Sequence, residues 1–416
     1  MAGDLSAAAG RTSVAIVGGG YAGMAAAVAL ARRGTPVKVY ESGPVLGGRA
    51  RRVQSRGEHW DNGQHILVGA YSALLGLMQE VGVPGEAMLR VPLELRYADG
   101  FSLRSLWLPA PLGLLGGLLL ADVPFAERWG AVRFMMAMRL RRFRVDPDCS
   151  VTELLERHGQ GGRIGHYLWR PLCVSALNTP PAQGSANAFL AVVRDSLAGA
   201  AGASDLLLPR VDLSKLFPEP AADFVRAHGG EVKASTPVKD LQEVLASHSH
   251  AIIAVGPHQL AALLPGEAPA YDYQPICTCY LQYGDKVRLP FPMLGFADGI
   301  LQWAFDRGSL LGETGRIACV ISAQGEHQQL GQEEIAAACH RELAALVRGL
   351  GEPSSSRVIF EKRATIACTP GRPRIGTDTS LPNVFLAGDY TDPEYPPTLE
   401  AAVRSGLRAA ARIPAR

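Results

Sequence analysis

Short apolar runs alternate with helix-like segments near both ends of the chain and in its middle, a pattern typical of a parallel α/β sheet. The first run, Val14–Val17, is rich in β-branched residues, as in a strand buried on both faces. The alanine-rich segment 24–33 then predicts a helix that stops at Gly34. Further strands are predicted around residues 37–39, from Glu231, over 250–255 and over 383–387. One sheet is therefore expected to form from separated segments.

Between Pro275 and Ile321 the pattern changes, because aromatic and aliphatic residues alternate with turns and predict an antiparallel sheet. Residues 105–121 carry no charge, but prolines and glycines interrupt them. A regular transmembrane helix is therefore not expected there. We predict a loop or broken helix that lines an apolar cavity or dips into a membrane surface.

The next segment has the spacing of an amphipathic helix, with arginines beside and behind an apolar stripe. Such a helix can lie on an anionic bilayer, or it can pack its stripe into the core and leave its arginines in solvent. Together with residues 105–121, the pattern favours a peripheral membrane contact. The stripe consists of Trp129, Val132, Met136, Leu140 and Phe143, flanked by Arg133, Arg139 and Arg144, with Arg128, Arg141 and Arg142 off it.

At 416 residues the chain can form two domains. Its formal net charge of +2 gives no indication of nucleic-acid binding. The 7 cysteines are scattered without a C-x-x-C pair, so no metal site is predicted and reduced thiols are the default. Residues 1–13 lack the apolar core of a signal peptide. We predict a cytoplasmic protein that works at the inner face of the cytoplasmic membrane.

The turn after the first strand has the form G-x-G-x-x-G. Its first glycine makes the turn, the second lets the backbone approach a pyrophosphate, and the third lets helix and strand pack closely. The helix N-terminus would direct free N–H groups at the phosphates, and an acidic residue at the end of the second strand would bind the ribose hydroxyls. This acid disfavours NADP and favours FAD or NAD. The predicted dinucleotide-binding residues here are Gly18, Gly20, Tyr21, Ala22, Gly23, Glu41 and Ser42.

Two other segments narrow the choice of cofactor. A second glycine loop follows the second strand and suits a place near the pyrophosphate, although a surface turn is the alternative. Near the C-terminus, a strand ends in Gly-Asp and a helix opens soon after it. That helix N-terminus could stabilise the charge of a reduced flavin, and the aspartate could bind a ribityl chain, which favours FAD. The residues predicted to bind FAD in these two segments are Gly48, Arg49, Gly388, Asp389, Thr398 and Leu399. Gln64 and His65, in the separate segment 60–67, are predicted to lie near the cofactor as well.

These blocks resemble the FAD-dependent amine oxidase and carotenoid desaturase superfamily. Within it, residues 61–71 and 168–179 resemble hydroxysqualene dehydroxylases, also called squalene-associated FAD-dependent desaturases, of bacterial hopanoid pathways. The resemblance implies an α/β (α+β two-domain) fold. A Rossmann-like FAD-binding domain would comprise residues 12–80, 207–266 and 365–416, and a substrate and membrane-contact domain of antiparallel sheet and helices would comprise 81–206 and 267–364. It also implies that the backbone of Val238 contacts the adenine.

The same resemblance implies reductive dehydroxylation of hydroxysqualene to squalene. A general acid would help the hydroxyl to leave as water, and N5 of the reduced flavin would deliver hydride to the resulting allylic-type cation. A long isoprenoid needs access from a membrane. Since no second dinucleotide motif is evident, the electrons would come from an external donor or reductase. The candidate acids are His65, Tyr71, Tyr390 and Glu394.

Other functions stay open at this point. A polyisoprenoid desaturase similar to phytoene desaturase, or an amine oxidase, would run the flavin in the opposite direction. A lipid-escort protein would use the fold without redox chemistry, but the preserved glycines, Glu41 and Asp389 speak against it. A nicotinamide dehydrogenase would leave the C-terminal Gly-Asp block without a role.

Overall fold

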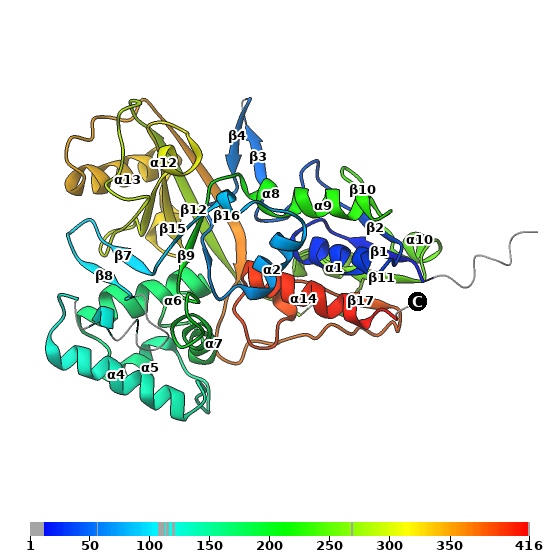
Figure 1. Ribbon diagram of the computed structural model, residues 1–416, viewed down its shortest axis with the longest axis horizontal. Coiled ribbons are helices and arrows are strands. Elements are labelled where there is room, and N and C mark those ends of the chain that lie inside the picture. Colours follow the sequence, from blue (N-terminus) through cyan, green and yellow to red (C-terminus); the bar gives the residue numbers. More distant parts are fainter. Residues whose placement is uncertain are drawn as a thin grey trace, which may run out of the picture.

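The structure is a computed structural model that describes residues 12–55, 57–106, 113, 116–118, 121–267 and 269–414. Two lobes lie side by side along the long axis, each with its own sheet (Figure 1). The first lobe contains a five-stranded sheet in the order β10-β2-β1-β11-β17, with all neighbours parallel. Its strands are β1 (Val14–Val17), β2 (Val37–Tyr40), β10 (Glu231–Lys233), β11 (His250–Ile253) and β17 (Val384–Leu386).

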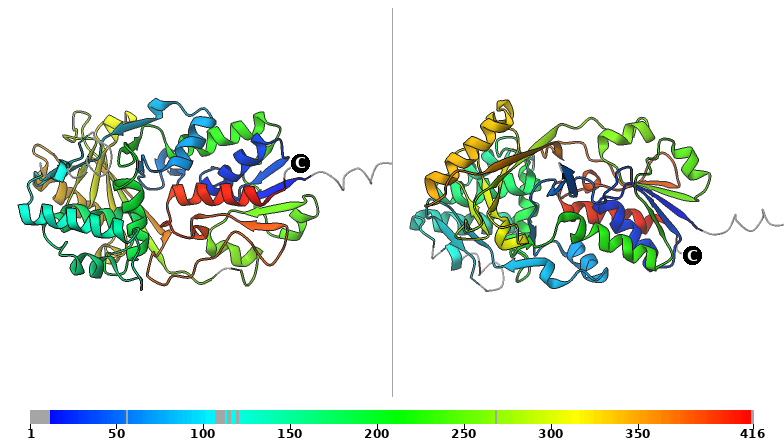
Figure 2. Two further views of the ribbon diagram at one scale, coloured as in Figure 1. Left: turned by 60° about the horizontal axis from the view of Figure 1, so that its bottom comes forward. Right: turned by 90° about the horizontal axis from the view of Figure 1, so that it is seen from above.

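Helix α1 (Tyr21–Arg32) is buried along almost its whole length, because it packs between the sheet and two other helices. Its crossing with α14 (Leu399–Arg412) is tight, since a Cβ on Gly406 would lie 2.1 Å from the Ala22 carbonyl oxygen. Both views in Figure 2 show α14 alongside α1. The other helices of this lobe are α2 (Ser72–Glu80), α8 (Leu213–Leu216), α9 (Pro218–Ala227), α10 (Leu241–Leu245) and α11 (Pro257–Leu263).

The second lobe is built on an antiparallel sheet in the order β13-β14-β15-β12-β16. One face, which includes Cys277 and Cys279, packs on α13, while Tyr280 on the other face belongs to the core beneath the remaining helices. The antiparallel sheet predicted between Pro275 and Ile321 is therefore present. Its elements are β12 (Tyr273–Gln282), β13 (Met293–Gly295), β14 (Trp303–Asp306), α12 (Arg307–Leu311), β15 (Arg316–Ser322), α13 (Gln332–Leu346) and β16 (Ser355–Ile366).

A helical layer completes the second lobe around the fully buried Trp169, whose ring meets Phe134 edge-on. Its helices are α4 (Phe125–Leu140), α5 (Val151–Arg157), α6 (Arg170–Leu177) and α7 (Ala186–Val192). Short strands form three smaller sheets, β3-β4, β5-β9-β6 and β7-β8, and the last of these packs beside β13 of the second lobe. Their bounds are β3 (Arg52–Ser55), β4 (Glu58–Asp61), β5 (Leu67–Val68), β6 (Met88–Val91), β7 (Glu94–Arg96), β8 (Ser102–Arg104) and β9 (Leu206–Pro209). On the basis of the two lobes, we propose the division into domains predicted above.

The two predicted membrane-contact segments have different outcomes. Most of residues 105–121 lies outside the described residues. Helix α4 forms as predicted, and its stripe faces outward, so the alternative with that stripe in the core is wrong. Phe143 does not belong to the stripe, because it follows the helix and turns back into the core at a positive φ of 54°. In the described part of the chain, no helix is both long and apolar enough to cross a bilayer.

Candidate active site

The first glycine loop joins β1 to α1 in a space that admits no side chain. Gly18 has a φ of 110°, and a Cβ on it would lie 2.6 Å from the Ala254 carbonyl oxygen. A Cβ on Gly23 would lie 2.0 Å from the Gly18 carbonyl oxygen, so this glycine lets α1 start against the strand. These contacts match the turn-forming role of the first glycine and the packing role of the third. The N-terminus of α1 thus faces the cavity described below.

Glu41, at the end of β2, connects this loop to the next segment. Its carboxylate accepts hydrogen bonds from the backbone N–H of Gly19 at 2.7 Å and of Gly43 at 2.7 Å. Both bonds are charge-assisted, so they hold the acid at the edge of the glycine turn. This is where an adenosine ribose is expected in a dinucleotide fold.

The second glycine loop lies against the first, because the Gly47 N–H donates to the Gly19 carbonyl at 3.0 Å. Arg49, two residues after Gly47, then reaches the C-terminal block. Its guanidinium donates to the Asp389 carboxylate and to the Ala364 carbonyl, at 2.7 Å each. Arg49 therefore joins segments that are more than 300 residues apart in the sequence.

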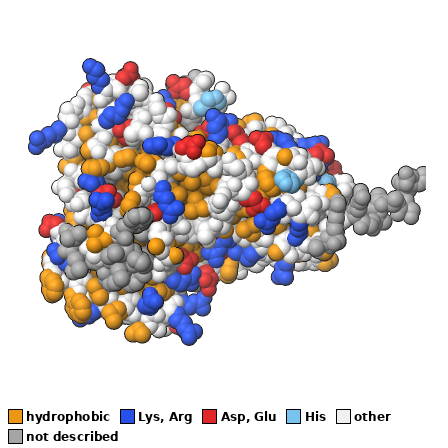
Figure 3. Space-filling view, viewed as in Figure 1, with side chains coloured by type: hydrophobic (Ala, Val, Ile, Leu, Met, Phe, Trp, Pro, Cys, Tyr) orange, Lys and Arg blue, Asp and Glu red, His pale blue; other side chains and the backbone are white. Residues whose placement is uncertain are grey.

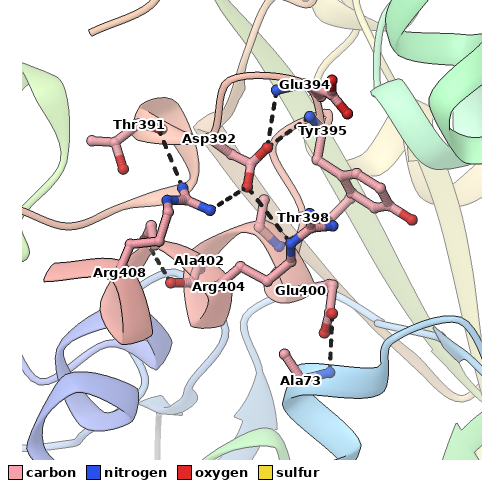
Figure 4. A network of polar contacts seen from close by, with 12 residues as sticks. Ala73, Thr391, Asp392, Glu394, Tyr395, Thr398, Glu400, Ala402, Arg404 and Arg408 are labelled. Carbon is pink, nitrogen blue, oxygen red and sulfur yellow. Dashed lines mark hydrogen bonds and ion pairs between the residues drawn. The ribbon is translucent and has the colours of Figure 1, made fainter. Parts of the chain in front are cut away.

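A polar network holds the loop between β17 and α14 (Figure 4). The buried Asp392 accepts from Arg408 at 2.9 Å and from the Tyr395 N–H at 2.8 Å, and these bonds lower its pKa although burial opposes them. Glu400, in the first turn of α14, accepts from the N–H groups of Ala73 and Leu74 at the start of α2. The N-terminus of α14 is thereby fixed beside the end of β17.

A third group of contacts fixes the segment that carries Gln64 and His65. Arg307 is buried and donates to Asp61 at 3.2 Å and to the Gln64 side chain at 3.1 Å. The Tyr280 hydroxyl donates to the Asp61 carbonyl at 3.0 Å. The segment is therefore attached to the second lobe, and Arg307 is a residue that sequence reasoning missed.

These segments enclose a cavity of about 640 Å³ that lies between the two sheets. One end is polar and is lined by the glycine loops and the C-terminal block. The other end is mainly apolar, although Thr278, Ser322 and Glu361 lie beside its apolar residues on the second sheet. These apolar residues are Ile66, Ala176, Ile276, Trp303, Phe305, Val320 and Ile359. The predicted residues that line the cavity are Gly18, Gly20, Tyr21, Ala22, Glu41, Ser42, Gly48, Arg49, Gln64, His65, Tyr71, Gly388, Asp389, Tyr390, Thr398 and Leu399.

Three predicted residues lie elsewhere. Gly23 acts from behind the loop, as described above. Val238 packs against the core beside the sheet and does not line the cavity, although nearby Thr236 donates its N–H to the Glu41 carbonyl. Glu394 forms ion pairs with Arg144 at 2.9 Å and Arg194 at 3.4 Å and does not line the cavity either. Glu394 therefore lies outside the cavity lining in this structure, and its role as the acid stays a prediction.

Two of the three remaining candidate acids have a buried polar atom without a described partner. The Tyr390 hydroxyl and His65 Nδ1 are buried without a hydrogen-bond partner among the described residues. Burial lowers the pKa of His65 to about 4, so its ring is neutral near pH 7. Burial raises the pKa of Tyr390, and also that of Tyr71, above the ordinary value. Buried polar atoms usually have partners, and both residues line the cavity, where a ligand can supply one.

Several polar residues of the cavity lining were not predicted. The buried Thr278 hydroxyl also lacks a described partner, and the other unpredicted polar residues of the lining include Ser175, Asn178, Glu361 and Arg363. The alternation along β12 could have indicated that Thr278 lies on the opposite face from Cys277 and Cys279. No local signal would have placed that face against the glycine loops.

The residues present fit FAD. A cradle without side chains at Gly18 and Gly20, a carboxylate at the ribose position and a helix N-terminus at Thr398 form the polar wall. The unpaired atoms of His65 and Tyr390 lie on the same cavity wall.

Comparison with known proteins agrees. The model of the family "Flavin containing amine oxidoreductase" matches residues 21–414. The chain is 29% identical to a hydroxysqualene dehydroxylase of Rhodopseudomonas palustris, with 96% of this chain and 97% of that one covered. It is 28% identical to a hydroxysqualene dehydroxylase of Sinorhizobium fredii, with the same coverage.

A solved oxidoreductase from Methanosarcina mazei shares the fold, with a TM-score of 0.71, 14% identity and coverage of 96% of this chain and 100% of that one. The resemblance found in the sequence motifs is thus confirmed over almost the whole chain. This chain belongs to the flavin containing amine oxidoreductase family and is an FAD-dependent oxidoreductase.

Proposed function

We propose that the protein catalyses the reductive dehydroxylation of hydroxysqualene to squalene, a step of squalene and hopanoid biosynthesis. The observation that carries this proposal is one continuous cavity, whose flavin-binding end opens into an end lined mainly by apolar side chains. An amine substrate would call for polar or charged groups there, whereas a polyene calls for an apolar wall. The names of the relatives that match the whole chain point to the same substrate.

When bound in its reduced form, FAD supplies the hydride. The chain holds the cofactor through the glycine loops, Glu41, the Arg49–Asp389 pair and the N-terminus of α14. The apolar side chains of Ile276, Val320 and Ile359 reduce the access of water, which would otherwise capture a carbocation. The chain thus provides orientation and a dry surrounding for the reacting carbon.

A proton must reach the hydroxyl oxygen of the substrate before it can leave as water. His65, Tyr71 and Tyr390 line the cavity and can hydrogen-bond a ligand there. Because the His65 ring is neutral near pH 7, its imidazolium form would be a strong but rare acid. The two tyrosines are weak acids in this setting, since burial raises the pKa of each. Replacing the true donor by His65→Gln, Tyr71→Phe or Tyr390→Phe should slow the reaction about a hundredfold.

The electrons come from an external donor or reductase, since the sequence contains one dinucleotide motif. The protein works at the inner face of the cytoplasmic membrane, where a long isoprenoid resides.

The test is an anaerobic half-reaction. The FAD-loaded protein is reduced, hydroxysqualene is added, and the oxidised flavin spectrum is followed together with squalene formation. Reoxidation in step with squalene supports the proposal. A flavin that stays reduced, while the oxidised protein is bleached by a polyene or an amine, would assign the protein to the desaturases or oxidases.

A further inference from the structure

Helix α4 is apolar on two opposite faces. Its inner face, with Ala131, Phe134, Met135 and Met138, is buried in the core of the second lobe. Its outer face carries Phe125, Trp129, Met136 and Leu140, whose side chains are 75%, 56%, 60% and 85% exposed. Among the described residues, these are four of the six exposed large hydrophobic residues. We call these four residues the outer face of α4.

The outer face is a straight stripe. At 100° per residue, its four members fall within about 40° of the direction of Trp129, and the stripe is about 22 Å long. It lies at one end of the molecule, away from the C-terminus, where apolar side chains gather at the lower left of Figure 3. Isolated exposed apolar residues are ordinary, whereas a contiguous stripe marks a surface that something covers.

The exposed charges beside this stripe and just after the helix are mostly positive. Arg133 and Arg139 flank it on opposite sides, and Arg141 and Arg142 follow the helix. All four are exposed, and their side chains form no hydrogen bond or ion pair with a described residue.

The nearby acids are occupied within the fold. Glu127 accepts the Ile164 N–H at 3.1 Å, and Asp122 pairs with Arg163 at 3.1 Å. The rim of the outer face is therefore positive.

We propose that the outer face of α4 binds flat on a lipid bilayer that contains anionic lipids. Trp129 and the aliphatic residues enter the interface between head groups and acyl chains, while Arg133 and Arg139 contact anionic head groups. A second copy of the chain fits the face less well, because a symmetric contact would bring the arginine rims of both copies together. The membrane binding itself does not depend on the proposed dehydroxylation. Its purpose does rest on the proposed function, since an apolar substrate must leave a membrane to reach the cavity.

The position of α4 relative to the cavity suits this purpose. Arg144, which follows α4, forms its ion pair with Glu394 at 2.9 Å. Glu394 lies in the loop between Asp389 and Thr398, both of which line the polar end of the cavity. A bilayer bound at α4 would therefore lie beside Arg144, which contacts the loop between Asp389 and Thr398.

The experiment is co-flotation of the full-length FAD-loaded protein with vesicles of phosphatidylcholine alone or mixed with phosphatidylglycerol. The wild type should float with the mixed vesicles and lose binding as salt is added. The variant Trp129→Ser/Met136→Ser/Leu140→Ser should bind at least about tenfold more weakly. The matched control, Leu330→Ser/Leu346→Ser, removes exposed apolar side chains elsewhere and should bind normally. The variant Arg133→Gln/Arg139→Gln should lose about fivefold in vesicle affinity per arginine, and only with the vesicles that contain phosphatidylglycerol.

Two results would overturn the proposal. One is a wild-type protein that binds neither kind of vesicle. This includes the case in which the only effect of the triple variant is to convert a dimer of this chain into monomers. The other is equal binding by the triple variant and the wild type. Turnover of hydroxysqualene dispersed in detergent separates the two proposals. The triple variant and the wild type should be equally active in detergent. If the wild type binds vesicles but does not turn over hydroxysqualene, the proposed reaction is wrong and the proposed membrane binding stands.

Discussion

The two ends of the cavity are built in opposite ways. The polar end consists mainly of backbone and of short contiguous motifs, such as residues 18–23 and 47–49. The apolar end consists of single side chains from separate elements, for example Ala176 on α6, Ile276 on β12 and Val320 on β15. The cofactor end therefore depends on close backbone contacts that leave room for few residue types. The substrate end depends on which faces of its helices and strands the second lobe brings together. Mutations at the two ends should fail differently.

The largest effect is expected at the glycine loop. Gly23→Val places a side chain where even a Cβ would be 2.0 Å from the Gly18 carbonyl oxygen, so α1 cannot keep its place against β1. We expect purified protein without bound FAD, or no soluble protein, as judged by the flavin-to-protein absorbance ratio. Gly76→Ala, on α2, adds a Cβ with nothing within 4 Å and should retain full flavin. A fully loaded Gly23→Val protein would refute the steric account of the polar end.

A second effect is expected at the contact between the two cofactor segments. Arg49→Met removes two hydrogen bonds and leaves the buried Asp389 carboxylate without its guanidinium partner. FAD affinity should fall about tenfold to a hundredfold, measured by fluorescence titration of the apoprotein. Arg32→Met breaks an ion pair of an arginine whose side chain is 58% exposed and should change the affinity less than about twofold. Equal losses of FAD affinity in the two variants would mean that Arg49 contributes only its positive charge and not its specific hydrogen bonds.

At the apolar end a smaller and different effect is expected. Val320→Thr keeps the side-chain volume but adds a hydroxyl to the apolar wall, so kcat/KM for a polyene substrate should fall up to about tenfold with flavin content unchanged. Val358→Thr makes the same change in the same sheet, on the face that packs in the core with α13. It should lower the thermal midpoint without changing KM. A reduced flavin content in Val320→Thr would show that the two ends are not separable.

The smallest effect is expected at His65, between the two ends. Its pKa of about 4 in the folded protein lies below the value of about 6.5 in an unfolded chain. The unfolded state therefore binds more protons between these pH values, and stability should fall as pH drops from about 6.5 to about 4. His65→Gln should show a shallower fall of the thermal midpoint over that range. His59→Gln, which replaces an exposed histidine on β4, should leave the slope unchanged.

What sequence reasoning could predict follows the same division. Gly18, Gly23 and Glu41 were predictable, because steric exclusion and helix ends impose residue types at fixed spacings. Arg307 was not, since its bonds to Asp61 and Gln64 join segments more than 200 residues apart. Thr278 was not, since only the folded structure places its face of the sheet in the cavity lining. The stripe on α4 was visible in the sequence, but its periodicity is the same for a core and for a surface. Only the packing of Phe134 and Met138 on its other side decided the direction in which it faces.

The order of strands in the first sheet has a consequence for biosynthesis. Strands β1, β2, β10 and β11 are made early, but their neighbour β17 begins at Val384, after all five strands of the second sheet. A growing chain on the ribosome therefore exposes one edge of β11 until nearly the whole second lobe has been translated. Asp389 and α14 arrive later still, so FAD loading should follow translation. A nonsense mutation before codon 384 would yield a polypeptide that carries the glycine motif and cannot retain the flavin.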